Sequence, residues 1–346
     1  MRNHSLSGQA AFQPSHMPDI ANALADASGL RIEIDRRRGR GAGLNPDGRF
    51  EALQREVFDD GWQTLEEMPE FRTEVQVEKP RSIITRNESP DIPFDRSINP
   101  YRGCEHGCIY CFARPTHSYM GLSAGLDFEA KLFAKPDAAK LLERELAKPG
   151  YKARVIAIGT NTDPYQPIER EWRIMRQILE VLAKADHPVA IVTKSALIKR
   201  DIDILAPMAK KGLVKVGISV TSLDRKLSRT MEPRILEAGK AAGATEASYV
   251  LLRLPLEVSP LFRDWLLRNY PDRYRHVMSL VRSMRDGKDY DAEFGKRMKG
   301  DGPYAWQIGR RFEMATKRLG LIRRGINLRD DLFVPPGGAG VQLSLL

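Results

Sequence analysis

Two patterns of apolar positions alternate through the middle of the chain. Short apolar or alternating runs are separated by longer stretches in which apolar residues recur every three or four positions. The short runs predict strands at residues 71–77, 128–134, 155–159, 189–193, 214–220 and 249–254. The longer stretches predict helices at residues 136–146, 171–185, 201–211 and 236–242. Because strands that alternate with helices usually pair in parallel through right-handed crossovers, the sequence predicts an α/β fold.

The pattern changes after Pro255, where only the helical period remains. Apolar residues recur at this period up to about residue 320, which predicts an appended helical lobe. The chain therefore divides into an N-terminal extension at 1–84, an α/β core at 85–255, a helical lobe at 256–330 and a flexible tail at 331–346.

Charge is unevenly distributed along these parts. Of a formal net charge of +10, residues 251–330 contribute 18 Lys and Arg against 10 Asp and Glu. Basic charge with interleaved aromatic residues is typical of nucleic-acid-binding surfaces; the aromatic residues are Trp265, Tyr270, Tyr274, Tyr290, Tyr304, Trp306 and Phe312. A solvated basic face over an aromatic core is the alternative. A second basic cluster, in the N-terminal extension, is either a solvated tail or a nucleic-acid arm; it comprises Arg36, Arg37, Arg38 and Arg40.

The apolar runs are short throughout. None approaches the roughly 20 residues that a membrane span requires, and the N-terminus lacks the continuous apolar stretch of a secretory signal. We therefore expect a cytoplasmic protein without a membrane partner.

All three cysteines lie in the single stretch NPYRGCEHGCIYCFARPTH at residues 99–117, with the spacing C-x3-C-x2-C. Pro100, Gly103 and Gly107 predict a loop in which the three thiolates converge on one point. Three thiolates leave one iron of a four-iron cluster with an open coordination position. The alternatives are a zinc site completed by His106 or His117, and a disulfide with one free thiol.

This stretch, with an aromatic Tyr110 before the last cysteine, resembles the cluster-binding motif of the radical S-adenosylmethionine (SAM) enzymes. The resemblance implies a [4Fe–4S] cluster on Cys104, Cys108 and Cys111, with SAM chelated at the open iron. It also implies reductive cleavage of SAM to a 5′-deoxyadenosyl radical, with an electron donor such as flavodoxin or ferredoxin. The implied fold is a partial (β/α) TIM-like barrel, which makes residues 85–255 the radical SAM core.

In such a barrel the functional groups lie at the C-terminal ends of the strands. This predicts cofactor-binding roles for Thr160, Asn161, Thr162, Asp163, Lys194 and Ser219, with Thr193 and Thr221 as neighbours. The resemblance to the cluster motif adds Tyr110 as a contact of SAM. The sequence TNTDP stands where the superfamily usually has a Gly-Gly-Glu loop that holds the SAM amino group. For each Thr or Asn, a role as a turn or N-cap residue is the alternative. No catalytic side chain is assigned.

A finer resemblance rests on the segments GTNTDPYQPIE, VTKSALIKRDIDIL and VGISVTSLD. They are similar to the spore photoproduct lyase-related group, often called DNA repair photolyases. That lyase uses a cysteine outside the cluster as hydrogen donor, and this chain has none, so a lyase-type repair would need Tyr or another group. Relatives also carry a further βαβ-sized piece between Arg234 and Ile235. Either the barrel lacks one βα unit or the sequence has lost a segment.

The chain ends in QLSLL after the flexible segment PPGGAG. This peptide resembles the motif by which DNA polymerases and repair proteins bind the sliding clamp, and its contact residues would be Gln342, Leu343, Leu345 and Leu346. The alternative is a tail that packs on its own domain.

Together these features predict a radical SAM enzyme that abstracts hydrogen from nucleic acid in a DNA repair-like, lyase-like reaction. A protein or tRNA substrate stays open. The alternative from another class is a non-enzymatic Fe–S or zinc DNA-binding accessory that is tethered to the sliding clamp.

Overall fold

The computed structural model describes residues 39–51, 72–220, 231–321, 325 and 327–337. Several predictions fall outside these residues. They concern Arg36, Arg37, Arg38, Thr221 and the C-terminal peptide with Gln342, Leu343, Leu345 and Leu346. None of the described helices is long and apolar enough to cross a membrane.

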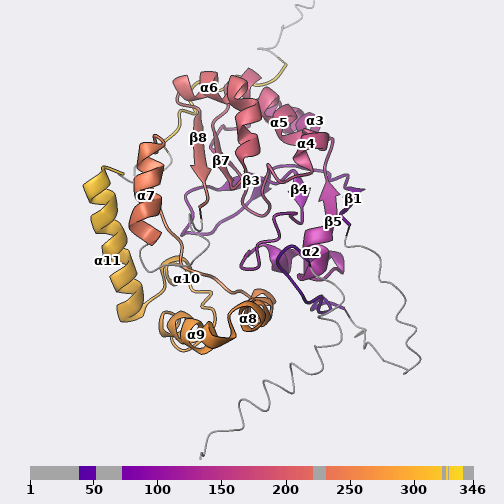
Figure 1. Ribbon diagram of the computed structural model, residues 1–346. Helices are drawn as coiled ribbons and strands as arrows, with labels where there is room; N and C mark the ends of the chain where they lie inside the picture. The colour runs from indigo at the N-terminus through magenta and orange to yellow at the C-terminus, as the bar shows by residue number, and fades with distance from the viewer. Residues whose placement is uncertain (1–38, 52–71, 221–230, 322–324, 326, 338–346) are drawn as a thin grey trace, which may run out of the picture.

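The larger of two sheets has the strand order β2-β3-β6-β7-β8 (Figure 1). Strands β3, β6, β7 and β8 pair in parallel, and β2 pairs antiparallel to β3 at the edge. The bounds are β2 (Thr85–Arg86), β3 (Arg96–Ile98), β6 (Ile156–Ile158), β7 (Val189–Thr193) and β8 (Val214–Ile218). No strand follows β8 in the described part of the chain, so the sheet stays open. The predicted α/β fold with a partial barrel is confirmed.

Helices cover one face of this sheet because alternate strand residues are apolar and point towards them. Ile156, Ile158, Val189 and Ile191 lie in one buried core with the apolar sides of α3 and α5. The covering elements are α3 (Ala138–Leu146), α4 (Glu169–Trp172), α5 (Ile174–Lys184), η2 (Ala196–Asp201) and α6 (Ile202–Lys210). The helix predicted at 171–185 is interrupted at Arg173, whose φ of 50° ends α4 before α5 begins.

A smaller sheet flanks the cysteine loop and has the order β1-β5-β4. Its strands are β1 (Glu74–Val77), β4 (Tyr101–Arg102) and β5 (Lys131–Ala134), and between β4 and β5 come η1 (Arg114–Met120) and α2 (Leu126–Ala130). The strand predicted at 128–134 is therefore only half correct. Its first half is helical, because Phe128 and Glu129 are fully buried and contact the cysteine loop.

The chain after Pro255 is helical, as its apolar period predicts. Its elements are α8 (Val258–Asn269), η3 (Pro271–Arg273), α9 (Tyr274–Ser283), α10 (Lys296–Lys299) and α11 (Gly302–Leu319), and α7 (Met231–Ala241) precedes them in the part predicted as core. In Figure 1, the arrow of β8 points towards the side of the molecule where α8, α9 and α10 lie. The strand predicted at 249–254 is absent; this segment is extended, and Leu251 N donates to Met298 O (2.9 Å) of α10 instead of to a strand.

Candidate functional site

The cysteine loop begins where β3 and β4 end, at the carboxyl edge of the parallel sheet. Two tight turns shape it: Gly107 N donates to Cys104 O (3.1 Å), and Cys111 N donates to Cys108 O (3.0 Å). Gly107 has a φ of 60°, which favours glycine. All three thiols are free; Cys104 is buried, and Cys108 and Cys111 are half-buried.

The three thiols form no ready-made single-ion site in the described part of the chain, and their predicted role as cluster ligands stays a prediction. Within the described residues, no group of three or more His, Cys, Asp or Glu side chains is placed to hold a metal ion. Burial raises the pKa of Cys104 to about 12, and Cys111 adds to this rise. The pKa of Cys111 is also raised, first by burial and then by Cys108 among other groups. Burial therefore favours the protonated form of both thiols.

A buried ion pair between Arg114 and Glu129 fixes the outer side of the loop. The guanidinium of Arg114 donates to the carbonyl oxygens of Gly107 and Cys108 (both 2.9 Å) and to those of Ala124 and Gly125 (3.0 and 2.9 Å). Both side chains are fully buried. Because a buried arginine with this many acceptors has little freedom, it sets the course of the loop backbone around Cys108.

The N-terminal segment at 39–51 forms part of this wall. Gly41 N and Ala42 N donate to the Glu129 carboxylate at 3.0 and 2.8 Å. Arg40 donates to Glu129 O and to the Glu105 side chain (3.2 Å). Arg40 is thus a structural contact of the cysteine loop and not part of a solvated tail.

Gln166 fixes the inner side of the loop. Its side-chain amide accepts from Glu105 N (2.9 Å) and donates to Gly103 O (3.3 Å) and to Thr162 Oγ1 (3.2 Å). Thr162 Oγ1 in turn donates to Gly103 O at 2.7 Å. The side chain of Gln166 is fully buried, so these bonds are shielded from water.

The TNTDP loop after β6 is joined to the ends of both neighbouring strands. Asn99, directly after β3, accepts from Asn161 N (3.0 Å) and contacts Thr160 Oγ1 (3.2 Å). Asp163 accepts from Thr193 Oγ1 (2.6 Å) and from Lys194 N (2.8 Å) at the end of β7. Asp163 therefore couples the ends of β6 and β7.

Lys194 lies between the ends of β7 and β8 and the cysteine loop. Its Nζ donates to Ser219 Oγ (3.1 Å) and lies 5.5 Å from the centre of the Tyr110 ring. Burial alone would lower the pKa of Lys194, but Tyr110 and Cys108 outweigh it and raise that pKa above its ordinary value. The ammonium group is therefore a stable positive charge beside the cysteines.

Neither histidine considered as a zinc ligand is placed for that role. His117 is fully buried between aromatic rings, and its Nε2 bonds to Lys131 O (2.9 Å). His106 Nε2 lies 3.5 Å from Asp163 Oδ2, across the loop.

The helical lobe packs directly on the cysteine loop. Ile109 and Tyr110 belong to one apolar cluster with Val258 and Leu261 of the lobe and with Leu254 just before it, as do Ala42 and Leu44 of the N-terminal segment. Arg253 lies over the ring of Phe112, with its Cζ 4.9 Å from the ring centre. The lobe therefore borders the site directly.

The structure thus brings the predicted residues Tyr110, Asn161, Asp163, Lys194 and Ser219 to one edge of the sheet. Thr160 and Thr162 are there too, bonded to Asn99 and Gly103. Sequence reasoning missed the residues that hold the loop, namely Asn99, Arg114, Glu129, Gln166 and Arg253. Only the nearness of Asn99 and Arg114 to the cysteines was a signal in the sequence.

Comparison with known proteins identifies the superfamily. The radical SAM superfamily model matches residues 98–244. Uncharacterized proteins of Mycobacterium tuberculosis and Mycobacterium bovis are 32% identical over 230 residues, which cover 54% of this chain and 68% of each relative. The chain belongs to the radical SAM superfamily. An uncharacterized protein of Methanocaldococcus jannaschii is 26% identical over 136 residues, or 39% of this chain and 48% of that protein.

Solved structures of spore photoproduct lyase show a weaker likeness. The enzyme complexed with a dinucleoside spore photoproduct is 12% identical, with a TM-score of 0.37 over 71% of this chain and 79% of that chain. A mutant that also has AdoMet bound gives a TM-score of 0.36 at 12% identity, over 71% and 78%. Radical SAM enzymes as a family generally use a [4Fe–4S] cluster and SAM.

Proposed function

We propose that this chain is a radical SAM enzyme that holds a [4Fe–4S] cluster on Cys104, Cys108 and Cys111 and abstracts hydrogen from a nucleic acid. One observation carries the proposal. Three free cysteines lie in a rigidly held loop at the carboxyl edge of a parallel sheet, beside the ammonium group of Lys194. This is the edge at which α/β proteins bind their ligands.

The residues present fit a four-iron cluster better than a single ion. A single zinc ion needs its ligands within about 2.3 Å of one point, whereas the thiolates of a cluster bind separate irons at its corners. Three thiols of one loop that form no ready-made single-ion site in the described part of the chain match the second requirement. When bound, the cluster supplies the electron, received from a donor such as flavodoxin or ferredoxin, that cleaves SAM into methionine and a hydrogen-abstracting 5′-deoxyadenosyl group.

The side chains around the loop have separate roles in this proposal. Lys194, with Ser219 as its partner, offers a positive charge and a donor to the carboxylate of SAM. Tyr110 lies beside Lys194 and covers one side of the same space. The TNTDP loop is kept in place by bonds from Asn161, Thr162 and Asp163 to Asn99, Gly103 and the end of β7. Thr160 lies at the edge of the cofactor site.

The charge and position of the helical lobe favour a polyanionic substrate. The lobe carries most of the net charge and packs directly on the cysteine loop, with Arg253 over Phe112. The chain has no cysteine outside the loop, so this chain offers no free thiol besides the proposed cluster ligands to return hydrogen to the product. We also retain, as a proposal, sliding-clamp binding through the C-terminal peptide.

The proposal is tested by binding of SAM to anaerobically reconstituted protein. Addition of SAM should change the electron paramagnetic resonance spectrum of the reduced cluster, and Lys194→Met should weaken this binding about tenfold, since a hydrogen bond to a charged group contributes about 1.5–3 kcal/mol. Lys211→Met is the matched control, because Lys211 pairs with Asp186 on the outer surface. A spectrum that SAM leaves unchanged in the wild-type protein would refute the proposal.

A further inference from the structure

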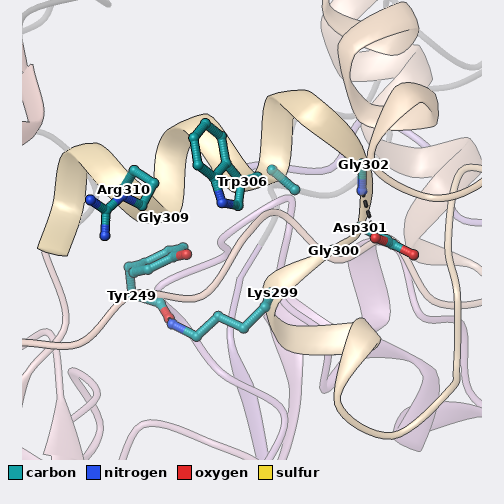
Figure 2. Close-up of a pocket in the computed structure, with 9 residues that line it drawn as sticks. Tyr249, Lys299, Gly300, Asp301, Gly302, Trp306, Gly309 and Arg310 are labelled. Carbon is teal, nitrogen blue, oxygen red and sulfur yellow. Dashed lines mark hydrogen bonds between the residues drawn. The ribbon is translucent and has the colours of Figure 1, made fainter.

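A pocket of about 320 Å³ lies between Tyr249, the end of α10 and α11. Its volume is at the lower end of the roughly 300–1,000 Å³ that is typical of small-ligand sites. Figure 2 shows Trp306 and Arg310 on α11 at one side of the pocket, with Tyr249 and Lys299 at the other. Nothing in the proposed cofactor site uses these residues.

The floor of the pocket is firmly held. Lys299 Nζ lies 3.4 Å from the centre of the Tyr249 ring and donates to Tyr249 O (2.8 Å). The Tyr249 ring also packs against Phe312, with the ring centres 4.7 Å apart. On α11, a Cβ at Gly309 would come within 2.9 Å of Tyr249 Oη, so only glycine leaves this ring in place without a shift.

The opposite wall exposes a large aromatic side chain. Trp306 is 69% exposed, although an indole would contribute more to stability if it were buried. On the same helix Arg310 pairs with Glu313 (2.7 Å), and both side chains are more than half exposed, so the pair contributes little. An exposed indole beside an exposed guanidinium is a combination that single-stranded nucleic-acid sites use for base and phosphate.

Charge favours a polyanion at this surface. Residues 296–319, which include α10 and α11, contain seven Lys and Arg against two Asp and Glu. One of the two acids, Asp301, accepts from Gly302 N (2.7 Å) at the start of α11. The basic residues therefore dominate the field around the pocket.

A series of side-chain contacts connects the pocket with the cysteine loop. Met298 precedes Lys299, and its Sδ lies 3.3 Å from Arg253 Nη1. The guanidinium of Arg253 in turn lies over Phe112, next to Cys111. The Nε of Arg253 is buried and has no hydrogen-bond partner among the residues that the structure describes, and the thioether is a weak acceptor. The guanidinium of Arg253 thus lies between the pocket and the cysteine loop and has hydrogen-bonding capacity that these contacts leave unused.

We propose that the pocket is a nucleotide subsite for a single-stranded nucleic acid, with a base stacked on Trp306 and a flanking phosphate on Arg310. Lys299 bounds the floor, and the strand continues past Arg253 to Phe112 and the cysteine loop. This inference rests on the proposed nucleic-acid function and names where the strand binds outside the reacting position.

The test measures binding rather than turnover. Fluorescence anisotropy of labelled 12-nucleotide single strands, one of DNA and one of RNA, is recorded with the full-length reconstituted protein. Trp306→Ala should weaken binding about tenfold, because stacking of one base contributes about 1–3 kcal/mol. Trp306→Phe should restore most of the affinity. Arg310→Gln should lower the slope of log affinity against log salt concentration by about 0.7.

Two control variants isolate the pocket. Met314→Ala removes another exposed side chain from α11, and Lys140→Gln removes an exposed charge from α3. Both should bind like the wild type. Wild-type affinity in Trp306→Ala and an unchanged salt slope in Arg310→Gln would overturn the subsite, as would absence of single-strand binding by the wild type. The change in the cluster spectrum on addition of SAM does not depend on Trp306, so it reports separately on the proposed function. Comparison of the DNA and RNA single strands shows which of the two nucleic acids the pocket binds.

Discussion

The buried carboxylate of Glu129 offers the sharpest test of how the cysteine loop is held. Glu129→Gln keeps the shape of the side chain but removes the charge that faces Arg114. It also replaces one of two acceptor oxygens with a donor, although Gly41 N, Ala42 N and Arg114 all need acceptors. Removal of one partner of a buried ion pair costs about 3–5 kcal/mol. We expect about 3 kcal/mol, because Arg114 retains four carbonyl acceptors.

The assay is urea unfolding of the cluster-free protein under anaerobic conditions, followed by circular dichroism. Glu237→Gln is the matched control, since Glu237 pairs with Arg318 on the surface and both side chains are at least half exposed. Its cost should stay below about 1 kcal/mol. Equal unfolding midpoints for Glu129→Gln and Glu237→Gln, with unchanged denaturant dependence, would refute the view that this ion pair fixes the loop.

Three further predictions concern Gln166, Gly41 and His187. Gln166→Ala removes three hydrogen bonds around Gly103 and should speed the loss of iron to a chelator, whereas Gln177→Ala, on an exposed face of α5, should not. Gly41→Ala places a Cβ 1.9 Å from Gly107 O and should cost about 1–3 kcal/mol of unfolding free energy, while Gly217→Ala, whose Cβ would make ordinary contacts, should cost little. Burial lowers the pKa of His187 to about 4, below its unfolded value near 6.5. The unfolded state therefore binds the proton more readily, and the stability that His187 contributes above pH 6.5 falls by roughly 2 kcal/mol by pH 5. His187→Gln should lack this contribution when the free energy of unfolding is compared between a pH above 6.5 and pH 5. An identical pH dependence in the wild type and in His187→Gln would contradict the prediction.

The parallel strands could be predicted because each is a short apolar run bounded by turn residues. The strand at 189–193 is predicted exactly, and those at 155–159 and 214–220 differ from β6 and β8 only at their ends. The segment 249–254 has a similar composition but is no strand. Composition favours a strand, but a strand also needs a partner strand, and here Leu251 N bonds to Met298 O of α10 instead.

The part of the candidate site that depends on the order of the parallel strands could be predicted from the sequence. Asp163, Lys194 and Ser219 each follow a parallel strand, so their nearness follows from strand order alone. The contacts between Arg114 and Glu129 and between Gln166 and Gly103 depend on how the loop curls back on itself. The pattern of apolar and polar positions in the sequence does not indicate how a loop folds onto itself. The open iron position that three thiolates leave could be inferred from the cysteine spacing. That the thiols form no ready-made single-ion site in the described part of the chain could not be inferred from it.

The direct test of the central claim is the formation of 5′-deoxyadenosine by anaerobically reconstituted protein with SAM and dithionite. The account predicts that wild-type protein with about four irons per chain forms this product, and that Cys108→Ser forms none. A wild-type protein that carries a full cluster yet releases no 5′-deoxyadenosine would contradict the account, as would equal product from Cys108→Ser.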